Sequence, residues 1–248
     1  MRNTFFIFFF IFFHCYSQYN MIDDSGFKQG YWKLFFPYSA DSIVAEEGNF
    51  FNDLEDGLWI KYHDNKQIRE VLYYSQGLLN GLKVSIDKKG KLKKQEFFVN
   101  DQYDGDQLYF HDNGKISMKI SYVHGIRHGP FIKYYKNGKK QETVKYVNSN
   151  KHGVANWYFD NEQISLQYIY DQGFIVDTAY AYYKDGVLKS TSFYVNNMLD
   201  GEKIMYYPSG LIKQKGSFLK DQKHGFWYEY DTLGYELNRI KYNNGLKK

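Results

Sequence analysis

A period of 24 residues runs along this chain and constrains its fold more than any single residue does. Glycine recurs at this interval, with one replacement by aspartate, at Gly57, Gly81, Gly105, Gly129, Gly153, Asp177, Gly201 and Gly225. An earlier copy begins at Gly30 and holds three extra residues before Gly57. We call the start residue of each copy position 0 and number the following residues from it. A fixed period of about 20 to 50 residues is typical of a repeat architecture.

Aromatic residues mark two positions of the repeat. Position 5 is aromatic in every copy except one, which has Ile86 there. Position 17 is aromatic in all copies from Gly57 onward: Tyr74, Phe98, Tyr122, Tyr146, Tyr170, Tyr194, Phe218 and Tyr242. Aromatic residues make up 21% of the chain, so chance does not explain their presence at one position in all these copies. The period therefore reflects a structural unit.

The first 18 residues differ in kind from the repeats. A short polar start with one charge, Arg2, leads into the apolar run at residues 5–13. This run suits the core of a signal peptide and is too short to span a bilayer. We therefore expect residues 1–17 to be a signal peptide, residues 18–29 a lead-in, and residues 30–248 an array of about nine repeats. Lipidation of Cys15 and an uncleaved anchor are the two alternatives.

Cysteine content and charge narrow the class of protein. Cys15 is the only cysteine, so a chain that begins at Gln18 has no disulfide and no cysteine ligand for a metal. Without Arg2 the chain has 31 basic and 28 acidic residues, a net charge of +3 (32 − 1 against 28). A nucleic-acid-binding domain typically has a strongly basic stripe. The composition therefore indicates an exported chain that does not bind nucleic acid.

The copy that starts at Gly129 shows how one repeat is built. Residues 130–135 form a short aromatic segment, and Asn137-Gly138 follows as a turn, because both residues accept a positive φ. Residues 140–147 form a second strand-like segment. Two strands and two turns in each copy predict consecutive antiparallel hairpins. We therefore expect an all-β fold, an elongated single-layer antiparallel sheet of 24-residue hairpin repeats.

Alternation along the strands predicts which side chains share a face. Positions 3, 5, 11 and 17 are mostly apolar or aromatic and have the same parity, so we expect them on one apolar face. Positions 12 and 14 hold many lysines and arginines, so we expect them on the opposite, polar face. The aromatic residues at positions 5 and 17 are then expected to form the core, stacked from copy to copy.

Several copies resemble MORN repeats. The segments are GLWIKY from Gly57, GPFIKYYKNGK from Gly129, GEKIMYYPSGLIKQKGSF from Gly201 and HGFWYEYDTLG from His224. They are most similar to the bacterial variant class often labelled the YwqK family of toxin–antitoxin antitoxins. The resemblance implies a twisted sheet of successive hairpins that serves in membrane association, in protein scaffolding or as an appendage to an enzyme.

Three residues depart from this pattern. Lys66 and Glu162 occupy the glycine position of the mid-repeat turn, and Asp177 replaces a start glycine. We expect these hairpins to be looser or to have longer turns.

No residue pattern predicts catalysis. The sequence has no GxSxG, HExxH, Walker or Rossmann motif. Glu46 and Glu47 are adjacent, but successive strand residues point to opposite faces, so the two carboxylates do not converge. His128, His152 and His224 each precede a start glycine, and a turn explains them better than a metal site, because neighbouring copies lie about 9 to 10 Å apart. We expect no enzyme activity, no cofactor and no metal.

Five residues are candidates for an interaction surface. Trp32, Trp59 and Trp227 share position 2, whose parity is opposite to that of the aromatic positions. We interpret them as caps at the two ends of the array or, alternatively, as exposed anchors for a partner. Lys119 and Lys215 share position 14 and are candidates for contact with anionic lipid or cell-wall polymer, the alternative being a solvated lysine face.

The sequence therefore predicts an exported, non-enzymatic interaction or scaffolding module at the bacterial envelope, with a protein as the expected partner. One alternative is an antitoxin or immunity protein. A second is a module that binds envelope glycan or anionic lipid. The export signal argues against an antitoxin that acts on a cytoplasmic toxin.

Overall fold

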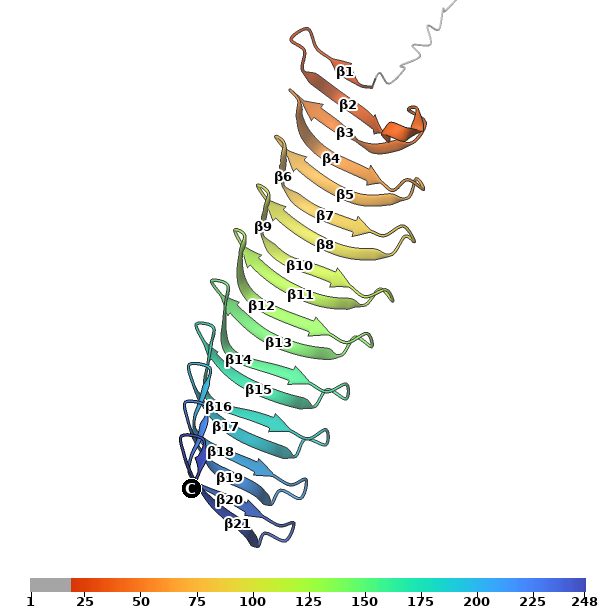
Figure 1. Ribbon diagram of the computed structural model, residues 1–248. Coiled ribbons are helices and arrows are strands. Elements are labelled where there is room, and N and C mark those ends of the chain that lie inside the picture. The colour runs from red at the N-terminus through yellow and green to blue at the C-terminus, as the bar shows by residue number, and fades with distance from the viewer. Residues whose placement is uncertain (1–18) are drawn as a thin grey trace, which may run out of the picture.

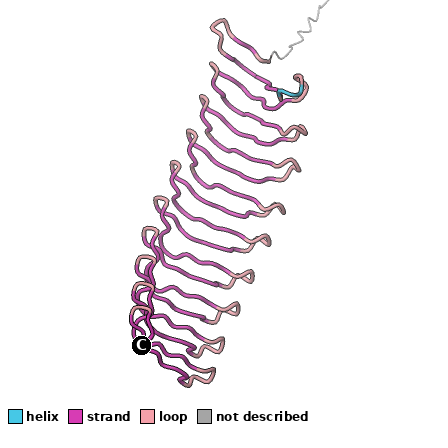
Figure 2. Tube along the Cα trace, viewed as in Figure 1, coloured by secondary structure: helices cyan, strands magenta, loops and turns pink. Residues whose placement is uncertain are grey.

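The computed structural model describes residues 19–248, so Cys15 and the expected signal peptide at residues 1–17 lie outside the described residues. The described part is one long row of antiparallel hairpins, stacked in chain order (Figures 1 and 2). The 22 strands belong to a single sheet, in which each strand pairs with the one before it, except that β6 and β7 both pair with β5 and that β9 and β10 both pair with β8. The expected elongated, single-layer, all-β fold is confirmed.

The strands are bounded as follows: β1 (Met21–Ile22), β2 (Lys28–Phe35), β3 (Val44–Phe51), β4 (Leu54–Tyr62), β5 (Ile68–Ser75), β6 (Leu78–Leu79), β7 (Gly81–Ile86), β8 (Leu92–Val99), β9 (Gln102–Tyr103), β10 (Gly105–Phe110), β11 (Ile116–Val123), β12 (Ile126–Tyr134), β13 (Lys140–Val147), β14 (Asn150–Tyr158), β15 (Ile164–Asp171), β16 (Phe174–Tyr182), β17 (Leu188–Val195), β18 (Met198–Tyr206), β19 (Ile212–Leu219), β20 (Gln222–Tyr230), β21 (Glu236–Asn243) and β22 (Leu246–Lys247). The extra residues of the first copy form a short 3₁₀ helix, η1 (Pro37–Ser39).

Two kinds of turn alternate along the two sides of the sheet. The long turns occupy positions 6–10, and each has a residue of positive φ at position 9. The short turns occupy positions 19 and 20, and both residues have a positive φ, as for Asn100 (48°) and Asp101 (63°). Two residues of positive φ define the hairpin turn whose twist matches that of the flanking strands.

The three residues that depart from the glycine pattern keep the glycine backbone. Lys66 has a φ of 68°, Glu162 a φ of 72° and Asp177 a φ of 64°, the left-handed conformation of the glycines in the other copies. Lys66 also closes its turn with a backbone hydrogen bond of 2.9 Å to His63. The expectation of looser hairpins is therefore wrong. Replacing glycine at these positions instead strains the backbone, because residues with a side chain disfavour the left-handed conformation.

Two register shifts in each repeat decide which side chains share a face. Lys61 pairs with Glu70, whereas the next residue, Tyr62, pairs with Ile68, so position 12 has no partner in the long-turn hairpin. A second shift lies close to position 15, where the strand pairs with the first strand of the following copy. It falls between Ile120 and Tyr122 in one copy and between Thr143 and Lys145 in the next. Each shift is a β-bulge that bends the strand and changes the alternation.

The hairpin pairing places position 17 on a different face from positions 3 and 5. Gly57 pairs with Tyr74 and Trp59 with Leu72, so positions 0 and 2 share a face with positions 17 and 15. Ile60, at position 3, pairs with Val71 on the other face. The expected face assignment is therefore wrong, because the bulge at position 12 reverses the alternation within the second strand of each hairpin.

The core forms on the face that contains positions 2, 15 and 17. Its buried apolar residues are Trp32, Phe50, Trp59, Leu72, Phe98, Ile120, Val144, Ala155, Ala179 and Trp227. Aromatic rings of neighbouring strands meet edge to face: the ring centroids of Phe50 and Trp59 are 5.0 Å apart, and those of Phe218 and Trp227 are 5.2 Å apart. This geometry suits the aromatic quadrupole and links one repeat to the next.

Side-chain size is matched between position 15 of one repeat and position 2 of the next. A Cβ atom on Gly216 would overlap the indole ring of Trp227, and a Cβ on Gly48 would overlap that of Trp59. Where position 15 is the larger Val144, position 2 of the next repeat is Ala155, which is fully buried. The side chains of the two positions therefore occupy the same space in the core, and either position can supply the larger side chain that fills it.

Lysine side chains cover the outer side of this core. Lys223 Nζ lies 4.1 Å from the ring centroid of Trp227, and Lys28 Nζ lies 4.7 Å from that of Phe50. Both lysines stand two residues before a start glycine. Their methylene stems cover apolar surface while the ammonium groups reach water.

Candidate interaction surface

The three tryptophans expected on the surface are in the core. The exposed fractions are 9% for Trp32, 1% for Trp59 and 3% for Trp227. Each indole N–H donates to a backbone carbonyl, at 3.1 Å for Trp32, 3.0 Å for Trp59 and 3.1 Å for Trp227. For Trp59 and Trp227 the acceptor is at the position next to the bulge, where the ladder is interrupted. The exposed-anchor interpretation is therefore corrected: these residues stabilise the sheet.

Gln107, which also stands at position 2, is a buried side chain that hydrogen bonds to the backbone without an aromatic ring. Its side chain is fully buried, accepts from the backbone N–H of Phe97 at 2.8 Å and donates to the carbonyl of Phe97 at 3.0 Å. The amide thus gives the backbone N–H of Phe97 an acceptor, while the carbonyl of Phe97 also accepts from the backbone N–H of Asp104 at 3.0 Å.

Lys119 and Lys215 lie on the opposite face from the tryptophans, and neither is a free cation. Lys119 Nζ forms an ion pair of 2.6 Å with Asp106. Lys215 Nζ lies over the rings of Tyr228 and Tyr230, 5.6 and 5.8 Å from their centroids. The structure therefore does not bring the five sequence-predicted residues together into one surface.

Glu46 and Glu47 diverge, as the strand alternation predicts. Glu46 pairs with Lys61 at 3.0 Å. Glu47 accepts hydrogen bonds from the hydroxyls of Tyr31 (2.6 Å) and Tyr62 (2.5 Å). Burial raises the pKa of Tyr62 to about 12, with help from the Glu47 carboxylate. Burial opposes ionisation of Glu47, but the two phenols outweigh it and lower its pKa.

Side chains in most of the long turns tie one turn to the next. His63 Nε2 hydrogen bonds to the carbonyl of Ile86 at 2.9 Å, and the hydroxyl of Tyr207 donates to the carbonyl of Tyr230 at 2.8 Å. The same pair of positions is bonded at other turns by His111, Tyr135 and Tyr183. These bonds join residues 23 apart in sequence and make the row of long turns a rigid edge of the sheet.

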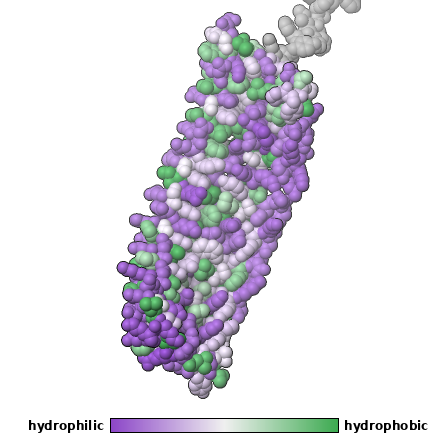
Figure 3. Space-filling view, in the orientation of Figure 1, coloured by the Kyte–Doolittle hydropathy of each residue, from purple (hydrophilic) through white to green (hydrophobic). Residues whose placement is uncertain are grey.

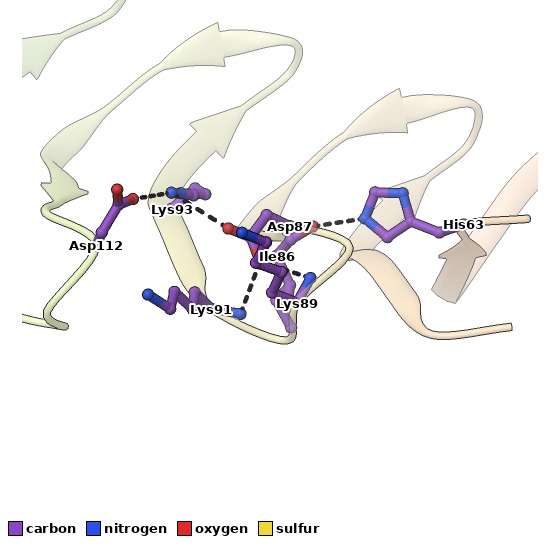
Figure 4. Close-up of polar contacts among 7 residues, drawn as sticks. All are labelled: His63, Ile86, Asp87, Lys89, Lys91, Lys93 and Asp112. Carbon is purple, nitrogen blue, oxygen red and sulfur yellow. Dashed lines mark hydrogen bonds and ion pairs between the residues drawn. The ribbon is translucent and has the colours of Figure 1, made fainter. Parts of the chain in front are cut away.

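The turn at residues 87–91 is the most basic of this row (Figure 4). Asp87 accepts from the backbone N–H groups of Lys89 (2.9 Å) and Lys91 (3.0 Å). Lys93 lies between two carboxylates, with its Nζ bonded to Asp112 of the next turn and 3.2 Å from Asp87. The bond with Asp112 raises the pKa of Lys93, and the backbone N–H of Lys91 is the main cause of the lowered pKa of Asp87.

A shallow hollow of about 250 Å³ opens between this turn and the next, lined by Asp87, Lys88, Lys89, Lys91, Lys93 and Asp112. The long-turn side of the molecule forms a hydrophilic band in the space-filling view (Figure 3). None of the residues that the sequence marked as candidates for an interaction surface lies among these lysines. The run at residues 87–94, with five lysines among eight residues, was the signal that could have found them.

His128, His152 and His224, which were expected in turns, instead lie in strands β12, β14 and β20, and two of them have polar partners. His152 Nδ1 is 3.4 Å from Asp171, and His224 Nδ1 is 3.2 Å from Asn244. Among residues 19–248 no cluster of His, Asp and Glu side chains has the arrangement of a metal site. Over the same residues, no helix has the length and apolar character needed to cross a membrane.

The repeats match a known family. Residues 55–76, 103–124, 127–148 and 178–196 match the family described as MORN repeat variant. The first three matches each begin two residues before a start glycine, in phase with the hairpins of the structure. The chain therefore contains MORN-variant repeats. No curated protein matches it. MORN repeats are generally non-catalytic and generally bind proteins or lipids, which makes this chain a repeat-based binding or scaffolding module.

Proposed function

We propose that this chain is an exported, non-enzymatic scaffolding module at the bacterial envelope and that its partner is a protein. The observation that carries the proposal is the continuous row of hairpins formed by residues 19–248, which are tied to one another by hydrogen bonds and give the sheet two long edges of turns (Figure 1). Rigid edges need little ordering when a partner binds, which favours affinity.

The hollows of the surface support a binding role over catalysis. One of about 360 Å³ is lined by residues of two neighbouring hairpins, among them Tyr207, Lys213 and Tyr230. Its polar groups are engaged with each other: Gln214 donates to Glu229 at 2.9 Å, and Lys213 Nζ lies 5.6 Å from the ring centroid of Tyr207. A catalytic group would instead be aimed at the place where a substrate reacts.

Export is supported by the pattern of residues 1–17, which has a charged start, an apolar core and a small residue, Ser17, before the expected cleavage site. Cleavage there would give a mature chain that begins at Gln18. Such a chain needs no disulfide, because the array buries its core by stacking.

The test is a crosslinked capture of the tagged protein from its native cells, with cell fractionation and intact-mass analysis. We expect a mature chain that begins at Gln18 in the envelope fraction, joined to one dominant envelope protein. A full-length cytoplasmic chain that holds a small toxic protein would overturn the proposal in favour of an antitoxin. Recovery of glycan or lipid without a protein would replace the protein partner by that ligand.

A further inference from the structure

We propose that the row of long turns between residues 63 and 139 is a docking site for an extended acidic segment of a partner protein. We call this row, with its lysines Lys66, Lys89, Lys91, Lys115 and Lys136, the lysine edge. The inference rests on the proposed function and deepens it, because it names the surface and the chemistry of the partner.

The five lysines of the lysine edge are exposed and have no carboxylate partner. Within the described residues, no Asp or Glu oxygen lies within 4.0 Å of any of their ammonium groups. The acidic side chains of this region are already paired: Asp64 with Lys88 at 2.8 Å, and Asp87 and Asp112 with Lys93. The edge therefore has uncompensated positive charge, which attracts an acidic partner.

The lysine edge is rigid and regular in spacing. His63 and His111 hydrogen bond to the backbone of the following hairpin, and the amides of Asn65 and Asn113 donate to the carbonyls of Lys88 and Lys136 at 3.2 and 2.7 Å. Successive turns are two strands apart, or about 9.6 Å. A polyproline II chain advances about 9.3 Å in three residues, so an acidic residue at every third position would meet each turn in succession.

The chemistry of the edge favours a polypeptide over a bilayer or a nucleic acid. A membrane-surface element combines basic residues with exposed apolar side chains that enter the lipid, and single-stranded nucleic acid needs exposed aromatic rings for stacking. None of the exposed large hydrophobic residues of the described chain lies in the turns at 63–67, 87–91, 111–115 and 135–139. On this side of the sheet they lie at Tyr38 in the first turn, at Ile68 directly after the turn at 63–67, and near the far end at Leu211, Leu233, Tyr235 and Leu237.

The test compares two triple variants of equal charge. Lys89→Glu, Lys91→Glu and Lys136→Glu reverse the lysine edge, whereas Lys145→Glu, Lys220→Glu and Lys247→Glu reverse three exposed lysines outside it. The probe is a fluorescein-labelled peptide of twelve residues with glutamate at every third position, followed by anisotropy at low salt. We expect binding to fall roughly tenfold or more in the edge variant and less than about twofold in the control.

Equal loss of binding in both variants would overturn the proposal, because it would show attraction to net charge alone. Tighter, edge-dependent binding to phosphatidylglycerol vesicles or to oligo(dT) than to the peptide would overturn the choice of partner. Circular dichroism of both variants checks that the sheet is intact. If cell capture recovers the same envelope protein with the edge variant as with the wild type, the lysine edge fails while the proposed function stands.

Discussion

The pairing of a glycine with a tryptophan across neighbouring repeats makes a quantitative prediction. Trp227 is 97% buried, its ring contacts Phe218, and its N–H donates to Ser217. Trp227→Ala removes this volume and the hydrogen bond, at a cost of about 4 kcal/mol of unfolding free energy. Gly216→Val forces a side chain into the space that the indole ring occupies, at a cost of about 2 to 3 kcal/mol.

The double variant is expected to be far more stable than the sum of its parts. Gly216→Val with Trp227→Ala recreates the combination that this chain already uses at Val144 and Ala155, both of which are buried. Independent effects would add to about 6 or 7 kcal/mol. Since the valine fills the space left by the indole, we expect a loss of about 2 to 3 kcal/mol instead, a coupling near 4 kcal/mol.

Urea unfolding followed by far-ultraviolet circular dichroism measures all four proteins of this cycle, and it does not depend on tryptophan emission. Val144→Ala is the control for deletion at position 15, with an expected cost of about 1 to 3 kcal/mol and no coupling to Trp227→Ala, because the sites lie three hairpins apart. Additive losses in the Gly216 and Trp227 cycle would refute the shared core volume.

Three further outcomes follow from the structure. Lys66→Gly removes the strain of a side chain at a φ of 68° and should raise the unfolding free energy by about 1 kcal/mol. Urea unfolding measures this change, and a lower unfolding free energy would contradict the assigned turn. Tyr207→Phe removes the 2.8 Å hydrogen bond to the carbonyl of Tyr230 and should lower the local stability of the adjoining turn by about 1 kcal/mol. Amide hydrogen exchange in that turn should become faster, and unchanged exchange would show that this bond does not stabilise the row of long turns. Burial raises the pKa of Tyr74 and Tyr194 to about 12 from 10.0, so the folded state holds these protons more tightly than the unfolded chain. The stability from these groups is complete below pH 10.0 and is lost as the pH rises toward 12; alkaline unfolding curves should show this slope, and Tyr194→Phe should reduce it.

The period predicted the hairpins because turn chemistry is local. Asn137-Gly138 accepts positive φ wherever it occurs, and a hairpin follows from two such turns in each copy. The faces could not be predicted in the same way. The bulge at Arg69, between the pairs Lys61–Glu70 and Tyr62–Ile68, changes the alternation, and a register shift depends on pairing rather than on the residues of one strand.

The candidate surface was the least predictable part. Tryptophan is equally compatible with a core and with an exposed anchor, and only the glycine opposite Trp59, at Gly48, shows that the ring is inside. The lysines at residues 87–94 were visible in the sequence, but their grouping with Lys66 and Lys136 depends on the stacking of successive turns along one side.

Small-angle X-ray scattering of the mature chain tests the central claim, that the repeats form one extended sheet. Its 18 full-length strands, without the two-residue β1, β6, β9 and β22 (22 − 4), would at about 4.8 Å each give a length near 86 Å and a radius of gyration of about 26 Å. A compact domain of this size would give about 17 Å. A value above about 23 Å with a rod-like distance distribution supports the sheet, and a value near 17 Å would contradict it.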